Sequence, residues 1–149
     1  MVPGGFGTRG VEGILAAIRY TREKKIPYFG LCYGMQLAVV EYARNVLGLK
    51  GAHTIECDTG AIHPVIHMIE GQDELIKRRA YGGTMRLGRW ECKVKTGTIA
   101  DDTYLKYHGY DDANEKTVWE RHRHRYEFNN TYAEALESAG LILAGRSIV

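Results

Sequence analysis

The sequence predicts an α/β domain, because stretches with helical spacing alternate with short apolar runs that suit buried strands. The chain opens with a glycine-rich loop and continues as a helical stretch, an apolar run and a second helical stretch. This order is typical of βαβ units, in which helices join parallel strands. No repeat, low-complexity tract or linker divides the chain, so we expect a single domain over residues 1–149.

The first half of the chain shows helix, strand and helix in that order. Apolar residues recur at i, i+3, i+4 and i+7 from Val11 to Ile18, which predicts a helix with one buried face. The apolar run KKIPYFGLC, between Lys25 and Gly34, suits a strand buried on both faces. GMQLAVVEYARNVLGL then predicts a long helix that ends at Gly48.

The second half is expected to hold antiparallel strands, a short helix and a last strand. From Gly51 to Gly83 the pattern is weak, and DTGAIHP and EGQDELIKRRAYGG are typical of exposed loops. TMRLGRWECKVKTG and TVWERHRHRYEF alternate as antiparallel strands do. In NNTYAEALESAG, Asn130 or Thr131 suits a helix cap and Gly140 a helix end. LILAGRSIV predicts a final strand; with MVPGG at the start, it indicates a domain incomplete at both ends.

Composition excludes several classes of function. A net charge of +2 is too small to favour nucleic acid or an anionic membrane as a partner. The three cysteines, Cys32, Cys57 and Cys92, are widely spaced, which argues against disulfides and a metal site and favours a reducing, cytoplasmic setting. The sequence has no apolar stretch of membrane-spanning length and no signal peptide.

Cys32 lies between two glycines, Gly30 and Gly34, at the predicted junction of strand and helix. This pattern is typical of a nucleophile elbow, where glycines make room for crowded backbone and the helix N-terminus favours a thiolate. The Tyr33 NH would then face a developing oxyanion. The alternative is that Cys32 is a small buried hydrophobe. PGGFG, residues 3–7, follows a possible strand and suits a second source of backbone NH groups, although such loops are often simple turns.

These motifs resemble the glutaminase domain of class I, triad-type glutamine amidotransferases. VPGGFGTRGVEG and PYFGLCYGMQLAVVEYARNVLG carry the resemblance, and GGTMRLG with ERHRHRYEFN narrows it to the CTP synthase branch of that family. It implies a flavodoxin-like fold with a central, mostly parallel sheet, helices on both faces and a small antiparallel element.

The resemblance also implies roles for single residues. Cys32 would attack the side-chain amide of L-glutamine and form a γ-glutamyl thioester. Backbone NH groups of Gly5 and Tyr33 would bind the oxyanion. Arg125, the last arginine of RHRHR, would recognise glutamine, whose zwitterion suits a guanidinium and a carboxylate. The implied glutamine-binding residues are Gly5, Phe6, Tyr33, Gly34, Met35, Gln36, Glu56, Arg125 and Tyr126.

Each of these residues has a simpler interpretation. Glu56 suits a solvated acid at a strand end, and Gln36 a polar residue in the first turn of a helix. RHRHR alone is typical of a solvated or phosphate-binding patch. GGTMRLG has no derivable chemistry; through the resemblance, Arg86 becomes a candidate for regulation by GTP. Tyr33 stands where the family more often has leucine, which could alter the pocket wall.

A thiol nucleophile needs a base, usually a histidine oriented by a carboxylate. The family supplies both from a His-x-Glu motif, but none of the six histidines here has glutamate two residues later. His67 and His124 have it three residues later, and we do not expect His122 or His124 to be the base. We expect the base and its partner to lie beyond Val149.

The predicted function is therefore hydrolysis of L-glutamine, with the ammonia used in ATP-dependent amination of UTP to CTP. The synthase domain, absent here, would bring ATP and Mg²⁺, with GTP as activator, because this sequence has no P-loop and needs no cofactor of its own. The resemblance implies a homo-oligomer, a tetramer in the full enzyme. Two alternatives stay open: the glutaminase domain of another class I amidotransferase, and a catalytically silent α/β interaction module.

Overall fold

The computed structural model of the chain describes residues 1–68 and 86–148. Its elements, in chain order, are α1 (Val11–Glu23), α2 (Tyr33–Asn45), β1 (Ala52–Thr54), β2 (His63–Met68), β3 (Arg86–Val94), α4 (Ile99–Lys106), β4 (Thr117–His124), β5 (Tyr126–Phe128), the 3₁₀-helix η2 (Asn130–Tyr132), α5 (Ala133–Ser138) and β6 (Gly145–Ser147). The α/β class predicted from the sequence is confirmed. Among the described residues, no helix is long and apolar enough to cross a bilayer.

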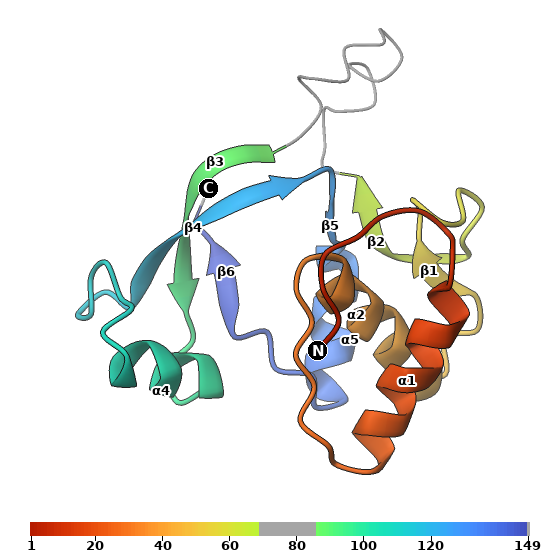
Figure 1. The fold of residues 1–149 in the computed structure, drawn as a ribbon, viewed down its shortest axis with the longest axis horizontal. Helices are drawn as coiled ribbons and strands as arrows, with labels where there is room; N and C mark the ends of the chain where they lie inside the picture. The colour runs from red at the N-terminus through yellow and green to blue at the C-terminus, as the bar shows by residue number, and fades with distance from the viewer. Residues whose placement is uncertain (69–85, 149) are drawn as a thin grey trace, which may run out of the picture.

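Helix α2 is central to the larger of two structural units in Figure 1. It packs against α1 and also against β1, β2 and β5. Eight of its thirteen residues are buried, as expected for a helix enclosed by neighbours. The core of this unit is formed by the apolar faces of α1, α2, β1, β2 and α5, with Leu37, Val40, Ile66 and Leu136 fully buried. The position of the α2 N-terminus is therefore supported by the buried core of this unit.

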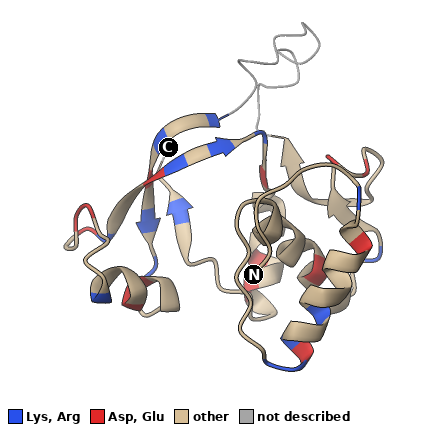
Figure 2. Cartoon of the chain, in the orientation of Figure 1, with Lys and Arg blue, Asp and Glu red and all other residues tan. Residues whose placement is uncertain are grey.

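The second unit is an antiparallel sheet of order β4-β3-β6, with α4 beside it in Figure 1. The β3–β4 pairing runs from Arg86 opposite His124 to Lys93 opposite Thr117. This confirms the antiparallel strands predicted from the alternating pattern. Figure 2 shows Lys and Arg along all three strands of this sheet.

Several of these cations lie in ion pairs at the surface. Arg89 contacts Asp111 at 3.1 Å, and Arg146 contacts Glu137 at 3.0 Å. Their charges are thus partly compensated by neighbouring acids rather than collected into one uniform patch.

The extended segment that follows α4 passes from one sheet to the other at a single residue. β4 ends at His124 and β5 begins at Tyr126, where it pairs antiparallel with β2 in the sheet of order β1-β2-β5. Arg125 is the residue between them. It therefore lies where the chain passes from the antiparallel unit to the helical unit.

The described strands are less parallel than the sequence analysis expects. Within residues 1–68 and 86–148, parallel pairing is confined to β1 with β2 and to an isolated bridge between Val2 and Gly30. The apolar run that predicts a buried strand before Cys32 contributes only this bridge, because Val2 is its one partner among the described residues. The expected last strand shortens to β6, which pairs antiparallel with β3.

Other boundaries also differ from the expectation. β2 includes His63 and Pro64, which the pattern places in a loop, and α4 has no prediction at all. The cap of the helical segment near residue 130 is Asn129, whose side chain accepts a hydrogen bond from the Thr131 NH. The prediction of Asn130 or Thr131 as the cap is therefore wrong. The predicted loop EGQDELIKRRAYGG and the first residues of GGTMRLG lie outside the described residues.

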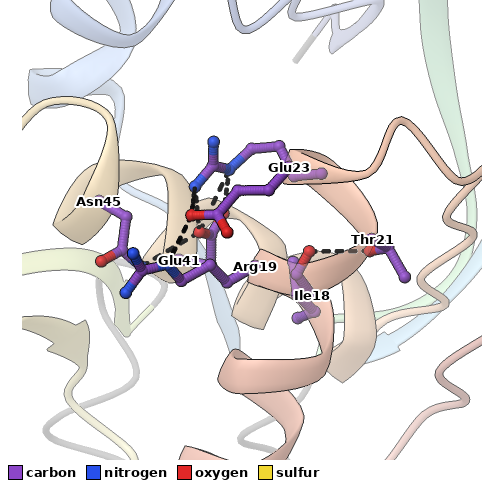
Figure 3. A network of polar contacts seen from close by, with 7 residues as sticks. Ile18, Arg19, Thr21, Glu23, Glu41 and Asn45 are labelled. Carbon is purple, nitrogen blue, oxygen red and sulfur yellow. Dashed lines mark hydrogen bonds and ion pairs between the residues drawn. The ribbon is translucent and has the colours of Figure 1, made fainter.

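A buried charge joins α1 to α2 (Figure 3). The Glu41 side chain is only 1% exposed, and its carboxylate accepts hydrogen bonds from Arg22 Nε at 2.9 Å and Arg22 Nη2 at 2.8 Å. Asn45 Nδ2 donates to the same carboxylate at 3.1 Å. The hydrogen bond to Glu41 is the main cause of a raised pKa for Arg22. A forked guanidinium thus compensates a carboxylate that would be costly to bury alone.

We expect Arg22→Met to lower the free energy of unfolding by about 2 kcal/mol, because it leaves the Glu41 carboxylate buried without its cation. Adding Glu41→Leu should restore most of that loss. Arg19→Met is the matched control, since its pair with Glu23 is exposed and should contribute less than about 1 kcal/mol. Urea denaturation measures all three; equal losses for Arg22→Met and Arg19→Met would contradict the prediction.

Candidate active site

Cys32 occupies a strained turn immediately before α2. Its backbone has φ 51° and ψ −102°, outside the conformations that non-glycine residues favour. It is the N-cap residue of α2, and its side chain is exposed. Among residues 1–68 and 86–148, its Sγ has no hydrogen-bond partner. An exposed thiol on a strained turn at a helix N-terminus has the geometry of a nucleophile elbow, so Cys32 is not the buried hydrophobe of the alternative interpretation.

The two flanking glycines are required by backbone contacts. A Cβ at Gly34 would lie 2.3 Å from the Val2 carbonyl oxygen, and one at Gly30 would lie 2.5 Å from the Gly34 carbonyl carbon. No side chain fits at these distances without moving backbone. Gly30 and Gly34 are therefore required because the β-bridge between Val2 and Gly30 packs directly against the first turn of α2.

The glycine-rich loop of residues 3–7 lies against the elbow. A Cβ at Gly4 would be 3.7 Å from Cys32 Cβ, and one at Gly5 would be 3.4 Å from the Tyr33 ring. Hydrogen bonds from the Val2 NH to the Phe29 carbonyl and from the Leu31 NH to the Val2 carbonyl, both 2.9 Å, hold the loop in place. The structure thus brings together the two motifs that the sequence analysis pairs.

Two backbone NH groups at this junction are free. Neither the Gly5 NH nor the Tyr33 NH donates a hydrogen bond within the described part of the chain. Tyr33 is the first residue of α2, where NH groups have no partner inside the helix. These are the two NH groups that the sequence analysis names as oxyanion donors.

Glu56 and Gln36 connect the elbow to its surroundings. Glu56 Oε1 accepts a hydrogen bond from the Gly7 NH at 2.9 Å. Glu56 is therefore not simply a solvated acid at the end of a strand. Gln36 is buried, and its Nε2 donates to the Tyr126 carbonyl at 3.0 Å. That bond ties the first turn of α2 to the residue next to Arg125.

Arg125 carries an unusual buried group. Its Nε is buried and has no hydrogen-bond partner among the described residues. A buried guanidinium NH without an acceptor is costly unless an acceptor binds there. Its position between β4 and β5, one residue from the Gln36–Tyr126 contact, places it beside the α2 unit.

The Tyr33 side chain has a role that the sequence analysis misses. It is 4% exposed, and its hydroxyl donates a hydrogen bond to the Gly7 carbonyl and lies 3.1 Å from Cys57 Sγ. The Cys57 thiol also donates to the Gly7 carbonyl, at 3.4 Å. Nothing in the spacing of these residues could have indicated the contact, because the partners lie 26 and 24 positions from Tyr33.

The remaining predicted residues are placed as follows. Phe6 is 87% exposed and Met35 is 44% exposed, so both present apolar surface beside the elbow. Arg86 forms an ion pair with Glu127 at 3.6 Å and stacks on Trp90 at 4.4 Å. Within the described residues, no group of three or more His, Cys, Asp or Glu could hold a metal ion.

His122 and His124 interact with each other. His122 Nδ1 and His124 Nε2 are 2.8 Å apart, and His124 Nδ1 lies 3.1 Å from the Tyr126 carbonyl. Because His124 Nδ1 donates to that carbonyl, its Nε2 accepts from His122 Nδ1, so the His124 ring is neutral in this arrangement. Burial is the main cause of a lowered pKa for both, and Arg86 lowers them further. No contact between either ring and Cys32 is present among the described residues.

The chain is similar in sequence to proteins of known function along almost its whole length. The glutamine amidotransferase class-I family model matches residues 1–148. The CTP synthases of Halalkalibacterium halodurans and Caldanaerobacter subterraneus are 50% and 53% identical over 147 residues, which is 99% of this chain and 25% of each relative. The chain thus spans about a quarter of the length of these relatives.

A solved structure is also similar. The glutaminase domain of Trypanosoma brucei CTPS with bound acivicin superimposes with a TM-score of 0.80 at 39% identity, covering 97% of this chain and 50% of that one. The expected class I glutamine amidotransferase fold is confirmed by this likeness and by the family match.

We expect Gly34→Ala to lower the free energy of unfolding by about 3 kcal/mol, because the new methyl group meets the Val2 carbonyl. Gly13→Ala is the control: this glycine lies in α1 with nothing within 4 Å of a Cβ, and alanine should stabilise the chain by about 0.5–1 kcal/mol. Thermal and urea unfolding measure both. A Gly34→Ala protein as stable as the parent would contradict the close contact.

The histidine pair predicts a loss of stability in mild acid. Since the folded chain holds the pKa of His122 and His124 below the ordinary value, the unfolded chain binds more protons below about pH 6.5. Stability should therefore fall as pH decreases through that value. His122→Gln with His124→Gln should reduce the slope, measured by urea unfolding from pH 7.5 to 5.5. An unchanged slope would show that the pair does not titrate in this way.

Proposed function

Since this chain belongs to the class I glutamine amidotransferase family, as its motifs predict, we propose that it hydrolyses L-glutamine to glutamate and ammonia. The single observation that carries the proposal is the exposed Cys32 thiol on its strained turn, with the free Gly5 and Tyr33 NH groups beside it. A nucleophile and two unpaired backbone donors are the parts that acyl transfer requires.

The proposed reaction starts at Cys32. Its thiolate, favoured by the positive N-terminus of α2, attacks the side-chain carbonyl carbon of glutamine. The carbonyl oxygen becomes an oxyanion that accepts hydrogen bonds from the Gly5 and Tyr33 NH groups. The C–N bond then breaks: the amide nitrogen takes up one proton, equivalent to the proton lost by the thiol, and leaves as ammonia, while a γ-glutamyl thioester remains. Water adds to the thioester carbon, and loss of the thiolate gives glutamate.

Arg125 supports recognition of glutamine as an amino acid. Its buried Nε lacks an acceptor in the described chain, and the α-carboxylate of glutamine is an acceptor of suitable charge. Glu56 holds the Gly7 NH with Oε1, and its carboxylate has further lone pairs for the α-ammonium group. We propose glutamine contacts for the other predicted residues as well: Phe6, Gly34, Met35, Gln36 and Tyr126.

The product ammonia is proposed to serve CTP formation in the complete protein. The CTP synthase relatives support this use, and the partner would be a synthase domain acting with ATP and Mg²⁺. We propose no ATP or Mg²⁺ for the hydrolysis itself, and the steps given above use only residues of this chain. Regulation through Arg86 and GTP, and a tetrameric assembly, are proposals of the same kind.

We expect Cys32→Ala in the complete protein to lower glutamine-dependent CTP formation at least about 1,000-fold and to leave ammonia-dependent formation unchanged. Coupled assays with glutamine and with ammonium salts measure the two activities. Equal loss of both activities would contradict a role confined to glutamine hydrolysis.

A labelling experiment separates the proposal from a silent interaction module. A glutamine-mimicking electrophile such as acivicin should add once per chain at Cys32, and glutamine should slow the reaction. Intact-mass and peptide analysis locate the adduct. Cys57 and Cys92 in the same protein are internal controls, since burial raises the pKa of both thiols and should keep them unlabelled. Absence of an adduct at Cys32 would favour the silent module.

A further inference from the structure

The backbone NH and the backbone carbonyl of Gly7 both form hydrogen bonds with side chains. Its NH donates to Glu56 Oε1 at 2.9 Å, and its carbonyl accepts from the Tyr33 hydroxyl and from the Cys57 thiol. Gly7 has φ +80°, a backbone conformation that glycine adopts without steric cost. This glycine ends the loop that begins beside Cys32.

Tyr33 contacts this loop at two points. Its hydroxyl reaches Gly7, and its ring lies 3.4 Å from where a Cβ of Gly5 would be. The side chain is almost fully buried, and it belongs to the residue that follows the nucleophile. One side chain thus connects the turn that carries Cys32 to the loop that carries the Gly5 NH.

Two hydrogens are available for hydrogen bonds among the Tyr33 hydroxyl, the Cys57 thiol and the Gly7 carbonyl. Tyr33 and Cys57 each supply one, and burial raises the pKa of both groups, so both hydrogens are present at neutral pH. If the Tyr33 hydroxyl donates to Cys57 Sγ, the Cys57 thiol can donate its own hydrogen to the Gly7 carbonyl. If the Tyr33 hydroxyl donates to the Gly7 carbonyl instead, that carbonyl is bound by Tyr33 itself. Either arrangement leaves the Gly7 carbonyl with a donor.

We propose that the Tyr33 side chain, with Cys57, positions the glycine loop so that the Gly5 NH and the Tyr33 NH face one oxyanion. Tyr33 is then a positioning residue through its side chain, beyond the part played by its backbone. The inference rests on the proposed glutaminase function for its catalytic consequence, whereas its structural part, the holding of Gly7, is independent of that function.

The first test is Tyr33→Phe in the complete protein, which removes the hydroxyl and keeps the ring. We expect kcat for glutamine hydrolysis to fall about tenfold with KM within about twofold, because a misplaced oxyanion donor weakens binding of the transition state more than of the substrate. Tyr42→Phe is the matched control: its hydroxyl donates to the Ala139 carbonyl at 2.6 Å, away from the elbow, and its loss should leave kcat unchanged. A kcat for Tyr33→Phe within twofold of the parent overturns the proposal.

The second test concerns Cys57. Cys57→Ser retains the second donor to the Gly7 carbonyl and should keep kcat within about twofold, whereas Cys57→Ala leaves the Tyr33 hydroxyl as the one side-chain donor and should lower kcat. Because the two groups share one acceptor, Tyr33→Phe combined with Cys57→Ala should differ from the sum of the single effects. Independent, additive effects would overturn the joint role of the pair.

Amide hydrogen exchange separates this inference from the proposed function. In Tyr33→Phe the Gly7 amide should exchange at least about tenfold faster than in the parent, and in Tyr42→Phe it should not. If the parent does not hydrolyse glutamine, the proposed function fails, and faster exchange still supports the holding of Gly7 by Tyr33. Unchanged exchange at Gly7 overturns the inference whatever the activity.

Discussion

The contact between Val2 and Gly34 is the constraint on which the site depends. The Val2 carbonyl accepts the Leu31 NH and lies where a Cβ of residue 34 would be. The start of the chain, the turn at Cys32 and the first turn of α2 therefore meet with no side chain between them. This close approach keeps the loop that carries the Gly5 NH next to the turn that carries Cys32 and the Tyr33 NH, because two backbone hydrogen bonds join the two segments.

The packing of α2 transmits this constraint to the rest of the molecule. The helix is enclosed by α1 and by the sheet of β1, β2 and β5, and the buried Arg22–Glu41 pair fixes it against α1. At its first turn, Gln36 reaches the Tyr126 carbonyl. Helix α2 thus begins at the proposed nucleophile, carries one of the proposed oxyanion donors and contacts the segment that contains Arg125. A single element carries most of the geometry that the proposed chemistry needs.

The sequence predicts local features better than it predicts pairing. The elbow was predictable because glycines flanking Cys32 have a local steric cause, and α1 and α2 were predictable because their apolar spacing is regular. The partners of a strand were not, since a period of two does not say which sheet a strand joins; the change of sheet at Arg125 is an example. The Tyr33–Gly7–Cys57 contacts also escape prediction, because hydroxyl and thiol groups acquire partners only when distant segments pack. Short elements such as α4 and β2 carry too few residues to show a period.

The division of one strand into β4 and β5 has a kinematic consequence. Only the two backbone dihedral angles of Arg125 separate the last residue of the antiparallel sheet from the first residue that pairs with β2. Along this connection, a rotation of one sheet relative to the other has to be taken up at or beside that residue. If Arg125 binds glutamine as proposed, the ligand would contact the residue that joins the two sheets.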